Sequence, residues 1–173
     1  MNINYSAIMA LAAILGLIVT MIIFLCESRR ARFSLGIDLI LRLDNYFNSV
    51  DFRKKRNEAA TALLSGDLSS ESQKVAVDDV LNFFETVGFL TRRGIIDFEV
   101  VWCFFFYYMH RYKLCTEEYI ETCRKEDQTI WEDFIEVYER VKEVEKRECR
   151  VSGKGLSFSG DVKRKFIENE AIR

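Results

Sequence analysis

The chain has 173 residues with 25 basic and 27 acidic side chains, and its formal net charge of -2 argues against a general binder of polyanions. Its length allows one small domain beside an apolar N-terminal segment. Five scattered cysteines with one histidine disfavour a structural zinc site, and the absence of proline favours long uninterrupted helices.

The first 26 residues carry no charged side chain, and residues 7–26 form an almost continuous apolar run that only Thr20 interrupts. At 1.5 Å per residue such a helix reaches about 30 Å, the thickness of the hydrocarbon core of a bilayer. The sequence therefore predicts a transmembrane anchor over 7–26, preceded by a short outer N-terminus over 1–6. A cleaved signal peptide is disfavoured because no basic residue precedes the run.

Three arginines follow this run: Arg29, Arg30 and Arg32. The positive-inside rule places this flank in the cytoplasm, so we expect the N-terminus outside and the domain inside, at the inner (plasma) membrane. Within the run, Ala12, Gly16 and Thr20 recur at four-residue spacing, which puts small side chains on one face of a helix. This face is a candidate for helix association and for a homo-oligomer.

Residues 27–47 read as a basic juxtamembrane segment and helix, with a short break expected near Ser34 and Gly36. Residues 48–149 then form a helical cytoplasmic domain. The expected fold class is all-α: one N-terminal transmembrane helix followed by a small multi-helix cytoplasmic domain.

Cap-type residues, glycines and apolar periodicity in this domain predict helices over 52–64, 74–87, 98–114, 117–126 and 128–149. The third contains VVWCFFFYYM, which is apolar or aromatic on every side and should form the hydrophobic centre of the domain. Its uncharged stretch is too short to cross a bilayer. After the last helix, the Gly-, Ser- and Lys-rich sequence has no period, which predicts a disordered tail over 150–173.

A catalytic signature is missing from the sequence, which has no phosphate-binding glycine loop, zinc-protease motif, calcium loop or nucleophile elbow. His110 is expected to be a partly buried or surface histidine and not a catalytic base. The carboxylates of 117–136 have the spacing of solvated helix faces. The aromatic residues are not interleaved with basic ones, which disfavours a nucleic-acid partner. We therefore expect no cofactor, no metal and no catalytic residue.

Two segments carry a resemblance to a known family: VLNFFETVGFLTRRGIIDFEVVW and CRKEDQTIWEDFIEVYER. With the earlier FRKKRNEAATALL, they resemble, over residues 45–145, a bacterial and prophage-associated family catalogued as domain of unknown function 4760. The resemblance implies one membrane helix with a small helical cytoplasmic domain. The positions that correspond to recurring family positions are Arg56, Gly88, Gly94, Asp97 and Arg124. The link to prophages implies, by analogy alone, a role in phage exclusion or antiviral defence.

The leading functional hypothesis is a membrane-anchored helical interaction module that binds a protein partner at the cytoplasmic face, with the lipid bilayer as its other partner. The first alternative is a defence effector that disrupts the membrane on ligand binding or oligomerisation. The second is an enzyme that acts on a membrane-proximal substrate. We expect no enzymatic activity because the sequence shows no catalytic signature.

Overall fold

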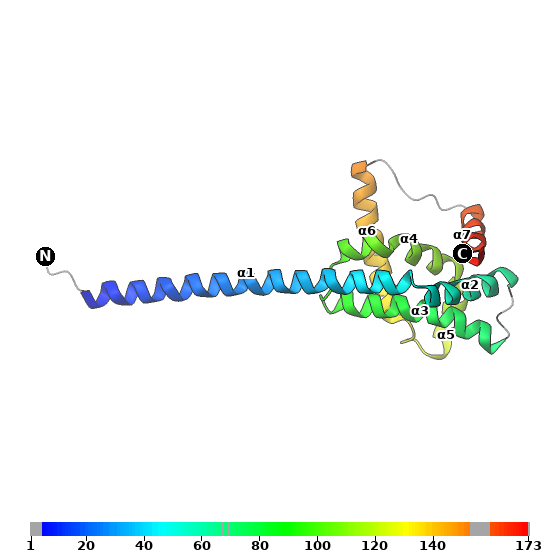
Figure 1. Ribbon diagram of the computed structural model, residues 1–173, viewed down its shortest axis with the longest axis horizontal. Coiled ribbons are helices and arrows are strands. Elements are labelled where there is room, and N and C mark those ends of the chain that lie inside the picture. Colours follow the sequence, from blue (N-terminus) through cyan, green and yellow to red (C-terminus); the bar gives the residue numbers. More distant parts are fainter. Residues whose placement is uncertain (1–4, 67, 69, 153–159, 173) are drawn as a thin grey trace.

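Figure 1 shows the computed structural model: a long N-terminal helix projects from a cluster of shorter helices. The structure describes residues 5–66, 68, 70–152 and 160–172, and the side chains of 9, 13–66, 68, 70–148 and 163–172. The described residues form seven helices: α1 (Tyr5–Phe47), α2 (Val50–Ser65), α3 (Glu71–Arg92), α4 (Phe98–Cys115), α5 (Glu117–Glu126), α6 (Glu132–Ser152) and α7 (Gly160–Ile172).

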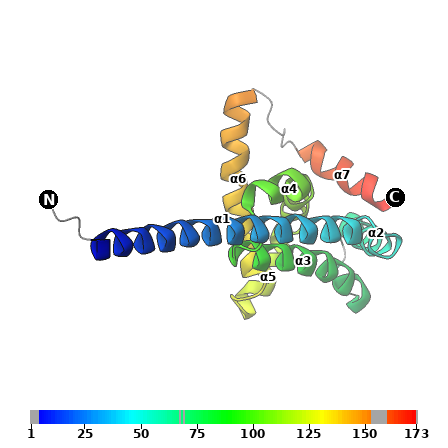
Figure 2. The same cartoon turned by 60° about the vertical axis from the view of Figure 1, so that its left-hand side comes forward.

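α1 is one continuous helix that joins the apolar N-terminal segment to the domain. Figures 1 and 2 show its first half projecting beyond the other helices, whereas its second half packs against α2 and α4. The break expected near Ser34 and Gly36 is wrong. A Cβ atom at Gly36 would lie 2.6 Å from the carbonyl oxygen of Ile95, so this glycine allows a close approach of two backbones and does not end the helix.

The predicted transmembrane anchor over 7–26 is contradicted by the structure. Over the residues that the structure describes, no helix is long and apolar enough to cross a membrane. The fold class is corrected to an all-helical fold with a long N-terminal helix. The side chains of 7, 8 and 10–12 lie outside the described ones.

Aromatic rings dominate the core. Phe47, at the end of α1, is fully buried, and its ring centroid lies 5.0 Å from that of Phe83, 5.8 Å from that of Phe84 and 5.7 Å from that of Phe105. Ring pairs at such distances contribute about 0.5–1.5 kcal/mol each beyond the burial of their area. The C-terminal end of α1 is therefore part of the domain and not merely a stalk.

α4 forms one wall of this core. Val101, Phe105 and Met109 are fully buried on its inner face, but Cys103 and Tyr107 are exposed on the other face. The prediction that the aromatic helix supplies the hydrophobic centre is therefore correct for its inner face. Although the helix is apolar or aromatic on every side, its outer face is exposed and not covered by other helices of the described part of the chain.

The contact between α3 and α6 explains why α3 continues to Arg92 although the sequence predicts its end at Gly88. A Cβ atom at Gly88 would lie 2.4 Å from the carbonyl oxygen of Asp133, so only glycine lets the two backbones approach this closely. Glu85 accepts hydrogen bonds from the backbone N–H groups of Asp133 (3.3 Å) and Phe134 (2.8 Å), which caps the start of α6.

The last helix corrects the predicted disordered tail over 150–173. α6 extends to Ser152, and α7 covers residues 160–172, with Phe166 and Ile167 buried in its contact with α2 and α4. Figure 2 shows α7 close to α2, at the end of the molecule opposite the projecting part of α1. Residues 153–159 of the predicted tail lie outside the described ones.

Candidate functional site

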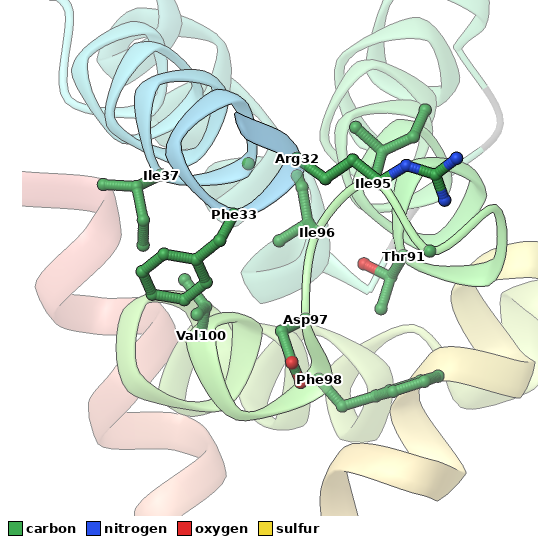
Figure 3. Close-up of a pocket in the computed structure, with 11 residues that line it drawn as sticks. Arg32, Phe33, Ile37, Thr91, Ile95, Ile96, Asp97, Phe98 and Val100 are labelled. Carbon is green, nitrogen blue, oxygen red and sulfur yellow. The ribbon is translucent and has the colours of Figure 1, made fainter. Parts of the chain in front are cut away.

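A pocket of about 290 Å³ opens where α1 leaves the domain, between α1 and the turn that joins α3 to α4 (Figure 3). Three segments contribute its lining: Arg32, Phe33, Gly36 and Ile37 from α1; Thr91, Gly94, Ile95 and Ile96 from the end of α3 and the turn; Asp97, Phe98 and Val100 from the start of α4. We call this the arm-root pocket.

The turn that closes the arm-root pocket follows from local sequence. Gly94 has a φ of 67°, a left-handed conformation that glycine adopts without strain, and its N–H donates to the carbonyl of Thr91 at 2.9 Å. Asp97 is the N-cap of α4, because its carboxylate accepts a hydrogen bond from the backbone N–H of Glu99 at 3.3 Å. These two residues fix where α4 begins relative to α1.

The pocket is mainly apolar, with charge at its rim. Figure 3 shows the Phe33 ring pointing from α1 toward the first turn of α4, where Val100 lies. Arg32 and Asp97 are both exposed, and the hydroxyl of Thr91 already donates to the carbonyl of Val87 at 2.6 Å. The volume is at the lower end of ligand sites, so the pocket has room for one apolar group.

The part of α1 that projects from the domain is apolar on all sides; we call residues 13–25 the arm. Ten large apolar side chains there are at least half exposed: Ile14, Leu15, Leu17, Ile18, Val19, Met21, Ile22, Ile23, Phe24 and Leu25. Because successive residues of an α-helix point about 100° apart, such a series covers the whole circumference. The predicted basic flank, Arg29, Arg30 and Arg32, follows directly and is exposed.

The predicted association face lies partly within the described residues. A Cβ atom at Gly16 would meet nothing within 4 Å, and the hydroxyl of Thr20 donates to the carbonyl oxygen of Gly16 at 2.8 Å. Thr20 thus satisfies its own polar group within the helix. The side chain of Ala12 lies outside the described ones.

The structure separates the five family-like positions. Gly94 and Asp97 both line the arm-root pocket, and Gly88 lies at the contact of α3 with α6. Arg124 donates to the carbonyl of Ile130 at 2.8 Å and so closes the turn before α6. Arg56 is buried at the contact between α2 and α7. These positions therefore do not form one site.

His110 is buried, and its Nδ1 lies 2.7 Å from the hydroxyl of Tyr138. Burial, with a smaller contribution from the charge of Arg111, lowers the pKa of His110 to about 4, so the ring is neutral at physiological pH. It contributes to the packing of α4 against α6. Among the described residues, no group of three or more His, Cys, Asp or Glu could hold a metal ion. The expectation that the chain is not an enzyme stays a prediction.

The family model for a domain of unknown function, DUF4760, matches residues 7–141 of the chain. The match confirms the resemblance seen in the sequence, and it begins at residue 7, so it includes the arm as well as the arm-root pocket and Arg56. It ends before α7. No curated protein and no solved structure matches the chain.

Proposed function

The chain belongs to the DUF4760 family, and we propose that it is a helical interaction module that attaches to a lipid bilayer through its arm. The observation that carries this proposal is the exposure of ten large apolar side chains around the whole circumference of residues 13–25. A contiguous exposed apolar surface of this kind marks an interaction site.

The bilayer is the occupant that fits this surface, because the arm is apolar on every side and a basic flank follows it. Removing apolar area from water contributes about 25 cal/mol per Å². Arg29, Arg30 and Arg32 would each add about 1 kcal/mol of attraction to an anionic membrane surface. Glu27, the acidic residue beside them, would offset part of this attraction.

The continuity of α1 gives this attachment a structural consequence for the domain. The same helix that carries the arm contributes Ile40 and Phe47 to the core, so the domain would be held in a defined orientation to the bilayer. The arm-root pocket would then lie beside the membrane surface, where it would accept an apolar side chain of a protein partner.

Flotation of the full chain with vesicles tests the attachment. The wild-type chain should float with vesicles that contain anionic lipid, and the double variant Ile18→Glu, Ile22→Glu should bind at least tenfold more weakly. The matched control is Val75→Glu on α3, because Val75 is also about half exposed (49%) but lies in the domain. Flotation of the double variant equal to that of the wild type would overturn the proposal.

The second candidate is the effector that disrupts membranes, which the open space around Gly16 favours because a second helix could approach there. Vesicles loaded with a fluorescent dye separate the two functions. An effector should release the dye, and Gly16→Leu should reduce the release by blocking close helix contact. Dye retention in vesicles that carry bound protein would exclude this candidate and leave the interaction module.

A further inference from the structure

Arg56 is a buried cation that belongs to the family-matched part of the chain. It lies on α2 and is 2% exposed. Its guanidinium carbon lies 4.2 Å from the ring centroid of Phe47 and 5.3 Å from that of Tyr108. Stacking on two rings stabilises the charge, but a buried guanidinium also requires hydrogen-bond acceptors or an anion.

The anion comes from α7. An oxygen of Glu170, itself 2% exposed, lies 3.4 Å from Nη1 of Arg56, and it accepts a hydrogen bond from the hydroxyl of Tyr112 at 3.3 Å. Burial raises the pKa of Tyr112 well above its usual value, so this phenol keeps its proton and acts as a donor. Asn57 of α2 also donates to the carbonyl of Ala171 at 2.5 Å.

Apolar contacts complete the docking of α7. Phe166 lies edge-on to three tyrosine rings of α4, with centroid distances of 5.9 Å to Tyr107, 6.3 Å to Tyr108 and 5.3 Å to Tyr112. Ile167 is buried beside it. Three basic residues of the same helix, Lys163, Arg164 and Lys165, are exposed. α7 is therefore an amphipathic helix that presents an aromatic residue and, four positions later, a carboxylate.

The contact with α7 leaves hydrogen-bonding capacity in the site. Nε and Nη1 of Arg56 have no hydrogen-bond partner among the described residues, and the contact with Glu170 is longer than a strong charge-assisted hydrogen bond. A carboxylate that approached the guanidinium with both oxygens would satisfy more of these donors. The site is therefore built for an acidic ligand and is incompletely satisfied by its present one.

The family boundary separates the site from its ligand. Phe47, Arg56, Tyr108 and Tyr112 all lie within the matched residues 7–141, whereas Glu170 lies beyond them. The Arg56 site, as we call these four residues with Asn57, thus lies within the family-matched part of the chain, and α7 lies outside that part.

We propose that the Arg56 site binds an amphipathic helix that presents a carboxylate, and that α7 occupies it as an intramolecular ligand that an acidic helix of a protein partner can replace. This inference rests on the proposed interaction module and names the chemistry of its partner. It does not depend on the arm, so failure of vesicle binding and failure of helix binding are separate results.

The test uses the full chain and a peptide of residues 160–172 as probe. In the intact chain α7 is tethered to the site, which gives it an effective concentration of about a millimolar and lets it compete with the added peptide. Docking of α7 within its own chain is therefore first weakened with the double variant Phe166→Ala, Ile167→Ala, which we call the opened chain. The labelled wild-type peptide should bind this opened chain at least tenfold more tightly than it binds the wild-type chain. A Glu170→Gln peptide should bind at least tenfold more weakly, whereas a Glu168→Gln peptide, with the same charge change outside the site, should match the wild type. Adding Arg56→Met to the opened chain should abolish binding.

Equal affinity of the two glutamine peptides would overturn the proposal, as would a dimer of the wild-type chain that exchanges α7 between copies. A second measurement does not use the opened chain. Hydrogen exchange of the backbone amides of α7 is compared between the wild-type full chain and its single variants Glu170→Gln and Glu168→Gln. The first variant should exchange at least tenfold faster over 163–172 than the wild type, and the second should not. Equal exchange in the two variants would also overturn the proposal.

Discussion

Replacing Gly88 by alanine tests whether two helix backbones touch at the position where the sequence suggests a helix end. The added Cβ would lie 2.4 Å from the carbonyl oxygen of Asp133, 2.5 Å from its carbonyl carbon and 2.8 Å from the nitrogen of Phe134. All three are backbone atoms, so no side chain can rotate away. The start of α6 would have to move relative to α3.

The magnitude follows from two opposing terms. Overpacking in a close-packed interior costs about 1–3 kcal/mol, and contacts with backbone belong at the upper end. Alanine gains about 1 kcal/mol of helix propensity over glycine. We therefore expect a net loss of about 2 kcal/mol, which corresponds to a fall in Tm of roughly 4–8 °C for a chain of this size.

Urea denaturation followed by circular dichroism measures this loss. The matched control is Gly16→Ala, the same chemical change in a helix where nothing lies within 4 Å of the new Cβ. It should leave the unfolding of the domain unchanged. If Gly88→Ala were as stable as Gly16→Ala, the close approach of α3 and α6 would be refuted.

Three further predictions concern the caps, the buried histidine and the arm. Glu85→Ala should lower the free energy of unfolding by about 1–2 kcal/mol because it removes the acceptor for two backbone N–H groups at the start of α6. The control Glu132→Ala changes an exposed residue and should lower it by less than about 0.5 kcal/mol. Equal effects of the two variants in denaturation experiments would contradict the capping contact. The pKa of His110 is about 4 in the folded chain and about 6.5 when unfolded, so the unfolded state binds a proton first, and stability should fall as the pH falls from about 6.5 toward 4. His110→Gln should remove that part of the pH dependence, and an unchanged profile would contradict the burial of the ring. Deleting residues 1–28 should leave the Tm of the domain within about 2 °C because the described side chains of the arm are exposed; a larger fall would show that the arm packs on the domain.

Local signals in the sequence were enough to predict several helix ends. Gly66 ends α2 in a left-handed conformation with a φ of 65°, and Asp97 caps α4, since each residue acts through its own backbone neighbours. Gly36 and Gly88 look the same as Gly66 in the sequence, yet both lie inside continuous helices. What distinguishes them is a backbone that approaches from a distant part of the chain, which no local pattern reports.

The helix α7 and the Arg56 site could not be predicted from the sequence either, because both depend on contacts between distant parts of the chain. Few apolar residues mark α7 within a charged segment. Its contacts join residues that are far apart in the sequence, 58 positions for Tyr112 with Glu170 and 114 positions for Asn57 with Ala171. The burial of Arg56, the last of four consecutive basic residues over 53–56, likewise depends on partners from other helices. A pairing of Arg56 with Glu170 has no local signature in either segment.

The most direct test of the proposed attachment is the environment of the arm when the chain is bound to vesicles. A tryptophan introduced at Leu17, 72% exposed in the structure, adds fluorescence to that of the two native tryptophans. In vesicles with brominated acyl chains, the additional emission of Leu17→Trp should be strongly quenched, and that of Val75→Trp in the domain should not. Unquenched emission from position 17 in the presence of the vesicles would contradict attachment through the arm.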